Sequence, residues 1–73
     1  MNKYVWAECP IDEWPTIKTV MATSLNDAEN KIIESYIKDF DLEDNFESFE
    51  VFRNYLNNDY SIALSDVEIY EEL

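Results

Sequence analysis

The clearest structural signal in the chain lies in residues 24–40, SLNDAENKIIESYIKDF. Seven apolar side chains in this segment recur at helical spacing and form one stripe: Leu25, Ala28, Ile32, Ile33, Tyr36, Ile37 and Phe40. Ser24 can cap the first turn, and Asp27 follows three residues later in a capping-box arrangement. The segment therefore predicts an amphipathic helix over residues 24–40, and its single apolar stripe requires a second layer of structure to bury it.

Two segments that precede this helix are typical of β-strands. Residues 3–9 and 16–23 are rich in aromatic and β-branched side chains. Pro10 and Pro15, the two prolines of the chain, mark a connection between these segments, because proline cannot donate a hydrogen bond within a sheet. We therefore expect an antiparallel hairpin whose strands are joined by a wide loop.

A second helix is predicted over residues 45–57. Asp44 or Asn45 can cap its start, and its apolar side chains again have helical spacing, at Phe46, Phe49, Phe52 and Leu56. Because the chain contains no glycine, asparagine is the residue best suited to the left-handed conformation that ends a helix. The helix is therefore expected to end at residues 57–59, which read Asn-Asn-Asp.

The segment after the second helix contains two alternating apolar runs, whose parity shifts by one at Ser65 and Asp66. This shift predicts a bend or bulge there, followed by the main third strand over residues 67–72. The order strand-strand-helix-helix-strand predicts one α+β domain spanning residues 1–73. We expect a two-layer sandwich in which two helices cover one face of a three-stranded, mainly antiparallel sheet. The other face of the sheet is expected to be partly open.

The composition excludes several classes of protein. The 73 residues include no glycine, no histidine and one cysteine, so glycine-rich phosphate loops, histidine-based catalysis, zinc sites and structural disulfides are not expected. We predict neither an enzyme nor a bound metal or other cofactor. The lone Cys9 is interpreted as a small buried apolar group in a protein of a reducing compartment. No segment resembles a signal peptide or a membrane span, so we expect a cytoplasmic location, the host cytoplasm if a phage encodes the chain.

The charge of the chain is strongly negative and unevenly distributed. Seventeen acidic and five basic residues give a formal net charge of −12. Residues 1–38 carry six acids and four bases, whereas residues 39–73 carry eleven acids and a single base, Arg53. Such a chain repels nucleic acid and anionic membranes, so neither is expected as a direct partner. The basic surface of a nucleic-acid-binding protein is the partner that this charge favours.

The acids of the second half fall into two groups. The group on the connection between the helices and the start of the second helix comprises Asp39, Asp41, Glu43, Asp44, Glu47 and Glu50. The group on the last strand comprises Asp66, Glu68, Glu71 and Glu72. Glu43, Glu47 and Glu50 are expected on one helical face, about 5–6 Å apart, near the spacing of successive phosphates in a nucleic-acid strand. The alternative is a solvated face that keeps a small protein soluble.

A calcium-binding loop is a second interpretation of the first group. In residues 39–50, four acids occupy positions 1, 3, 5 and 12 of such a loop, namely Asp39, Asp41, Glu43 and Glu50. Asp44 occupies the sixth position, where the sharp turn requires glycine, and Glu43 is longer than the usual ligand at its position. The sequence therefore favours an acidic connection without bound calcium.

Two tryptophans are further candidates for interaction. Trp14 lies between the two prolines, next to Glu13, and a tryptophan in a constrained loop beside acids is typical of an anchor for a protein partner. A ring folded over the end of the core is the alternative for Trp14. It is the favoured interpretation of Trp6, which lies in the first strand.

The whole chain resembles, in size, acidity, α+β pattern and lack of catalytic residues, the phage and mobile-element proteins that inhibit host nucleic-acid enzymes by imitating DNA. Anti-CRISPR and anti-restriction proteins belong to this group. Residues 20–29, VMATSLNDAE, are also similar to the strand-to-helix join of small β-β-α-β proteins from phages and conjugative elements. The resemblance implies a non-catalytic inhibitor that presents acidic side chains to the nucleic-acid-binding groove of a host enzyme.

A module of another class is the alternative function. It would regulate or assemble a protein partner through a sheet edge or the Trp14 loop, and its charge would serve solubility alone. A homodimer also remains open. Salt distinguishes the two functions, because charge-driven binding weakens steeply with ionic strength and an apolar contact does not.

Overall fold

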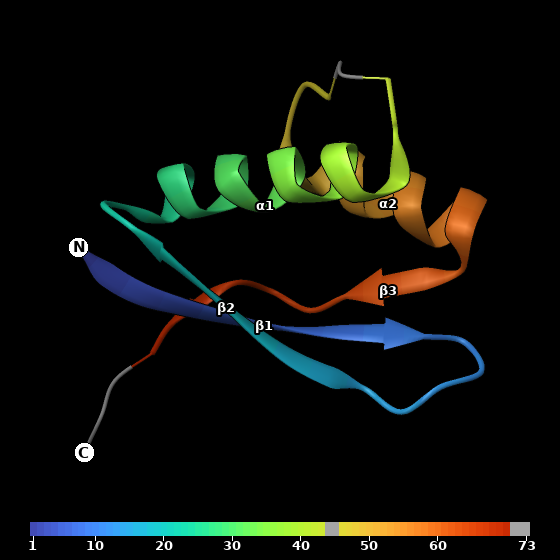
Figure 1. Ribbon diagram of the computed structural model, residues 1–73, viewed down its shortest axis with the longest axis horizontal. Coiled ribbons are helices and arrows are strands. Elements are labelled where there is room, and N and C mark those ends of the chain that lie inside the picture. Colours follow the sequence, from blue (N-terminus) through green and yellow to red (C-terminus); the bar gives the residue numbers. More distant parts are fainter. Residues whose placement is uncertain (44–45, 71–73) are drawn as a thin grey trace.

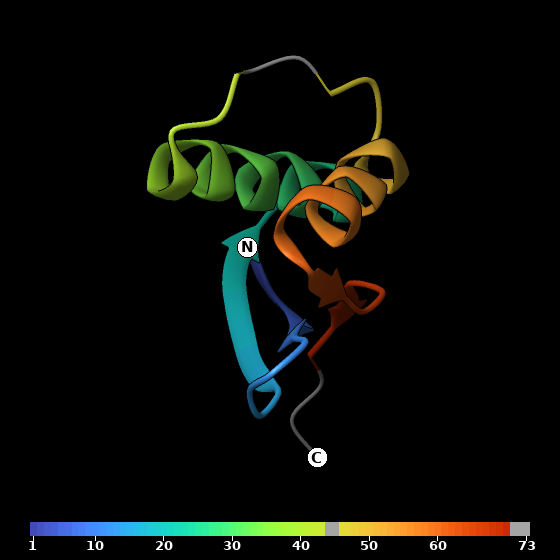
Figure 2. The same ribbon diagram turned by 90° about the vertical axis from the view of Figure 1, so that its right-hand side faces the viewer.

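The computed structural model describes residues 1–43 and 46–70 and forms two layers. Four strands make one sheet, and the helices α1 (Leu25–Phe40) and α2 (Phe49–Tyr60) both lie on the same face of it (Figures 1 and 2). This arrangement confirms the predicted α+β sandwich. Each helix has one apolar face, and the shared sheet allows both faces to be buried in a single core.

The strand β1 (Asn2–Pro10) occupies the centre of the sheet. The strand β2 (Thr16–Ala22) pairs with it in antiparallel fashion, from Asn2 opposite Ala22 to Glu8 opposite Thr16. On the other side of β1, the short strands β3 (Ile62–Leu64) and β4 (Glu68–Ile69) pair with its two ends, also antiparallel. The expected hairpin is confirmed. The third strand position is filled by two strands, and not by the one main strand expected over residues 67–72, of which 71 and 72 lie outside the described residues.

The break between β3 and β4 is the expected bulge. Leu64 pairs with Glu8, and Glu68 pairs with Val5, so three residues on this edge face two residues of β1. Ser65 bridges the irregular stretch, because its backbone N–H donates to the Ala7 carbonyl at 3.0 Å and its hydroxyl accepts from the Ala7 N–H at 2.8 Å. The extra residue explains the shift of parity between the two apolar runs.

Helix α1 begins as the sequence predicts. Ser24 is its N-cap, and the Ser24 hydroxyl accepts from the backbone N–H of Asp27 at 3.1 Å. The Asp27 carboxylate accepts from the backbone N–H of Thr23 at 2.9 Å, one residue earlier than a capping box requires. This hydrogen bond lowers the pKa of Asp27, and Lys31, at 3.4 Å, contributes to the same shift. Asp41 ends the helix in the left-handed conformation, with φ of 54°.

Helix α2 begins and ends later than expected. Its N-cap is Ser48, whose hydroxyl accepts from the Val51 N–H at 3.2 Å, so the prediction of a cap at Asp44 or Asn45 was wrong. The residues expected to end the helix are helical, and Ser61 takes the left-handed conformation instead, with φ of 56°. The extra turn places Tyr60 against the rings of Phe40 and Tyr55, at centroid distances of 5.1 and 5.9 Å.

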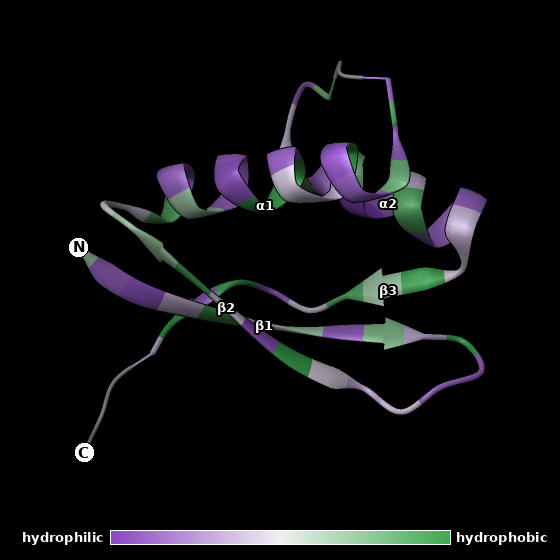
Figure 3. Cartoon of the chain, in the orientation of Figure 1, coloured by the Kyte–Doolittle hydropathy of each residue, from purple (hydrophilic) through white to green (hydrophobic). Residues whose placement is uncertain are grey.

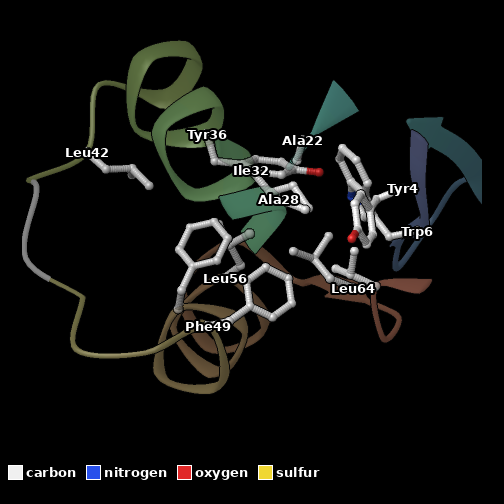
Figure 4. Close-up of a cluster of buried hydrophobic side chains, with 12 residues drawn as sticks. Tyr4, Trp6, Ala22, Ala28, Ile32, Tyr36, Leu42, Phe49, Leu56 and Leu64 are labelled. Carbon is white, nitrogen blue, oxygen red and sulfur yellow. The ribbon is translucent and has the colours of Figure 1, made fainter. Parts of the chain in front are cut away.

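The core lies between the helices and the inner face of the sheet (Figure 4). Trp6 is buried there, as expected, and Phe52, Ile32 and Leu56 are its most deeply buried large side chains. Phe46 lies before α2 but still packs on Phe52, with ring centroids 5.2 Å apart. The helical surface directed away from the sheet is largely hydrophilic (Figure 3).

Candidate interaction surfaces

The connection between the helices carries the densest charge in the described chain. Its described residues, 41–43 and 46–48, lie on the side of the helices that faces away from the sheet (Figures 1 and 2). Five carboxylates on it and on the adjoining helix ends are exposed to solvent: Asp39, Asp41, Glu43, Glu47 and Glu50. We call these five residues the acidic connection. Two apolar side chains, Leu42 and Phe46, attach the connection to the core.

The acidic connection differs from the predicted helical row of charges. Glu43 and Glu47 precede α2, and only Glu50 lies within it, because the cap at Ser48 delays the helix. The expected row of three carboxylates on one helical face is therefore wrong. Asp44, another predicted member, lies outside the described residues.

The second predicted group of acids lies elsewhere. Asp66 lies between β3 and β4, and Glu68 lies in β4, so both belong to the sheet layer. The Arg53 guanidinium holds the Asp66 carboxylate at 2.9 Å and thereby compensates its charge. Glu68 has no basic partner among residues 1–43 and 46–70. Glu71 and Glu72 lie outside the described part of the chain.

Four of the five basic side chains are engaged away from the acidic connection, whereas Lys38 lies in the last turn of α1, next to Asp39. Among the described residues, the ion pairs join Lys18 to Glu8, Lys31 to Asp27 and Arg53 to Asp66. Lys3 lies over the ring of Tyr70, with Nζ 5.3 Å from the centroid. No ion pair within the described residues involves a member of the acidic connection, and Lys38 is the basic residue nearest to it along the chain.

The calcium-loop hypothesis concerns residues 39–50, of which 44 and 45 lie outside the described part of the chain. In the described residues, no group of three or more cysteine, aspartate or glutamate side chains is arranged to hold a metal ion. Asp39 and Asp41 lie at the end of α1, and Glu50 is the second residue of α2. Helix α2 thus starts just before the position at which a calcium loop would supply its last ligand.

The turn between β1 and β2 presents an exposed tryptophan. Trp14 is 89% exposed, so the alternative of a ring folded over the core is wrong. Ile11 is exposed beside it, and together with Asp12 and Glu13 these residues line a shallow hollow. The Ile11 N–H donates to the Ser61 carbonyl at 3.1 Å, which ties the turn to the end of α2. Ile11 was not among the residues predicted for interaction, although its place between the two prolines was a usable signal.

The outer face of the sheet, which no helix covers, is also apolar. Because Tyr4 and Trp6 point into the core, alternation directs the residues between and beside them outward, together with their cross-strand partners. We define the outer face by six apolar residues, Val5, Ala7, Cys9, Ile17, Met21 and Tyr70, together with the polar residues Lys3, Thr19 and Glu68, which lie between or beside them. Cys9 is a free thiol and only half-buried, not buried as expected. This surface was not predicted, although consecutive apolar residues in β1 are typical of a strand covered on both faces.

A polar cluster closes one end of the core. The Tyr36 hydroxyl donates to the Glu8 carboxylate, and Lys18 lies 3.4 Å from the same carboxylate. Burial raises the pKa of Tyr36 well above its usual range, and the bond to Glu8 raises it further. The hydroxyl is therefore held protonated as a donor, which suits a structural role and not that of a nucleophile or general base.

Comparisons with protein-family models, with curated proteins and with solved structures find no match to this chain. The described residues contain no helix with both the length and the apolar character that crossing a membrane requires. The three surfaces described above, namely the acidic connection, the Trp14 turn and the outer face, are therefore interpreted from their own geometry and chemistry.

Proposed function

We propose that this chain is a non-catalytic inhibitor that occupies the nucleic-acid-binding groove of a host enzyme with the acidic connection. The observation that carries the proposal is the exposure of Asp39, Asp41, Glu43, Glu47 and Glu50 without a basic partner among the described residues. Lys and Arg side chains that neutralise phosphates in such a groove can equally neutralise carboxylates.

Helix electrostatics favour a role for these charges outside folding. Asp39 and Asp41 lie at the C-terminal end of α1, where the negative pole of the helix dipole disfavours acids. Glu50 differs, because an acid in the first turn of α2 stabilises that helix. Folding therefore accounts for Glu50, and also for Asp41, because aspartate suits the left-handed conformation that ends α1. Binding to a basic partner would account for Asp39.

Competition for cationic side chains would be the mechanism. The chain would neither bind nucleic acid itself nor transform it, and its negative field would accelerate encounter with a positive groove. The surface in contact with the groove would be limited to the acidic connection, because Arg53 largely compensates the charge of Asp66. We place this activity in the cytoplasm, where host nucleic-acid enzymes act and where a free thiol such as Cys9 stays reduced.

The test compares two variants of equal charge. One combines Asp39→Asn, Glu43→Gln and Glu47→Gln in the acidic connection. The control combines Asp59→Asn, Glu29→Gln and Glu34→Gln, and Asp59 occupies in α2 the position that Asp39 occupies in α1, one residue before the helix end. The binding kinetics of the partner captured from host lysate are measured at two salt concentrations, with duplex DNA as competitor.

The first variant is expected to weaken binding by about 1–2 kcal/mol, chiefly through slower association and a shallower salt dependence. The control should bind like the wild type to within a few tenths of a kcal/mol. Equal losses in both variants would show that only total charge matters. DNA that binds the partner alongside this chain, without competition, would refute groove occupation.

A protein-binding module anchored by Trp14 is the second candidate function, and the exposure of this ring favours it. An aromatic side chain on a turn between two prolines loses little conformational entropy when it enters an apolar pocket. In the same kinetic experiment, Trp14→Ala would then accelerate dissociation with little dependence on salt. A variant with wild-type dissociation would exclude Trp14 as the anchor.

A further inference from the structure

The outer face departs from what a solvent-facing sheet normally presents. Antiparallel sheets with one face in water usually alternate apolar residues inward with polar residues outward. In β1 the inward residues Tyr4 and Trp6 alternate with outward Val5 and Ala7, so the central strand is apolar on both faces. Ile17 and Met21 on β2 extend this surface and are 67% and 47% exposed.

The described residues of the outer face carry no net charge. Its charged residues, among those described, are Lys3 and Glu68, one of each sign. Glu68 pairs directly with Val5, and Lys3 lies two residues from Val5 along β1. A chain of net charge −12 repels a second copy of itself, and the described residues of the outer face add no net charge to that repulsion.

We propose that the outer face binds a second copy of this chain, so that the two sheets stack face to face about a two-fold axis. Such an interface is self-complementary, because the same apolar residues meet from both sides. The axis would place Lys3 of each copy near Glu68 of the other. The two helical layers, with their acidic connections, would then lie at opposite ends of the dimer, far from each other.

The size of the face implies a weak dimer. Three strand positions span about 15 Å and seven residues about 23 Å, so each copy contributes on the order of 300–400 Å² in projection. A standard interface contributes about 800 Å² per partner. We therefore expect a reversible dimer with a dissociation constant between about 10 μM and 1 mM.

The experiment is sedimentation velocity on the purified chain from about 10 μM to 1 mM. We expect a shift from monomer to dimer across this range. Met21→Glu should raise the dissociation constant at least tenfold, because it places a charge in the apolar contact. Val51→Glu is the matched control: Val51 is 45% exposed, lies on α2 and should leave the equilibrium unchanged. Its charge also falls at the third helical position after Ser48, where glutamate completes a capping box.

Two measurements on the wild type keep the proposal testable if a variant misfolds. Dilution should shift the NMR signals of the Val5 and Ile17 methyl groups but not those of Leu25, which is exposed on α1. Salt should strengthen the dimer, because screening relieves repulsion between like-charged copies, whereas it should weaken the binding proposed for the acidic connection. The two proposals can therefore fail separately.

Three experimental results would each overturn the proposal of a dimer. A single monomeric species at the highest concentration would show that the outer face does not bind a second copy. A dimer equally sensitive, or equally insensitive, to Met21→Glu and Val51→Glu would place the contact on another surface. An association that weakens with salt would show that opposite charges, not the apolar face, drive it.

Discussion

The two faces of the sheet use similar side chains but have different roles. On the inner face, Tyr4 and Trp6 are buried beneath the helices, whereas on the outer face Val5 and Ala7 remain partly accessible. Both pairs belong to the same strand and share one hydrogen-bond ladder with β2. Coverage by the helices therefore determines which of these residues stabilise the fold. The outer residues contribute less to stability and are available for association.

Substitution of one isoleucine on each side of the sheet tests this difference most strongly. Ile32→Asp places a charge at a site that is 1% exposed, in α1 above the inner face, and should unfold the chain. The penalty of several kcal/mol rivals the whole stability expected for a small domain. Ile17→Asp places the same charge on the outer face and should change the free energy of unfolding by less than about 1 kcal/mol.

Circular dichroism during thermal unfolding checks both substitutions at low protein concentration, where the proposed dimer is absent. A folded Ile32→Asp variant with the wild-type melting temperature would contradict the core assignment. An unfolded Ile17→Asp variant would show that the outer face is as essential to the monomer as the inner one.

Local signals in the sequence were sufficient for the first helix. Ser24 and the apolar stripe that follows it act within a few residues of one another, and the structure retains both. The start of α2 was ambiguous, because Asp44, Asn45 and Ser48 are all good caps. Packing resolves the ambiguity: a start after Ser48 places Phe49, Phe52 and Leu56 in the core. Such contacts between distant segments are not visible in a local pattern.

Only the composition of the candidate surfaces could be predicted from the sequence, and not the arrangement of their residues. The charges of the acidic connection follow directly from the sequence, but their relative placement depended on where α2 begins. The exposure of Trp14 could not be deduced, because an aromatic ring beside prolines suits either a core edge or a free turn. The outer face could not be identified without the register of β2 on β1, which places Ile17 opposite Ala7.

The polar cluster at Glu8 provides a smaller test of the inner face. Tyr36→Phe removes the hydroxyl that donates to the Glu8 carboxylate and should lower the free energy of unfolding by about 1–2 kcal/mol at neutral pH. This hydroxyl also predicts a pH dependence. Because the pKa of Tyr36 is raised in the folded protein, its contribution is complete below the unfolded value of about 10 and is lost as the pH rises beyond it.

Urea unfolding of wild type and Tyr36→Phe between neutral pH and about pH 11 measures this contribution. The wild type should lose about 1.4 kcal/mol per pH unit above 10 from this group, so the gap between the two proteins should close. The other tyrosines are common to both proteins and cancel in the difference. A gap that stays constant with pH would show that Tyr36 ionises as readily in the folded as in the unfolded chain.

The smallest predicted effect concerns two aspartates of the helical layer, each of which lies near the end of a helix. Asp39 and Asp59 each lie one residue before the end of a helix, where the dipole disfavours a carboxylate. Asp39→Asn and Asp59→Asn should therefore each raise the free energy of unfolding by a few tenths of a kcal/mol at low salt, and the gain should vanish as salt screens the dipole. Thr19→Asn on the outer face is the control, since it changes no charge and should show no salt-dependent gain. Denaturant unfolding at low and high salt measures all three. If Asp39→Asn were destabilising at both salt concentrations, the Asp39 carboxylate would have a stabilising role in the fold, and binding to a basic partner would no longer be needed to account for it.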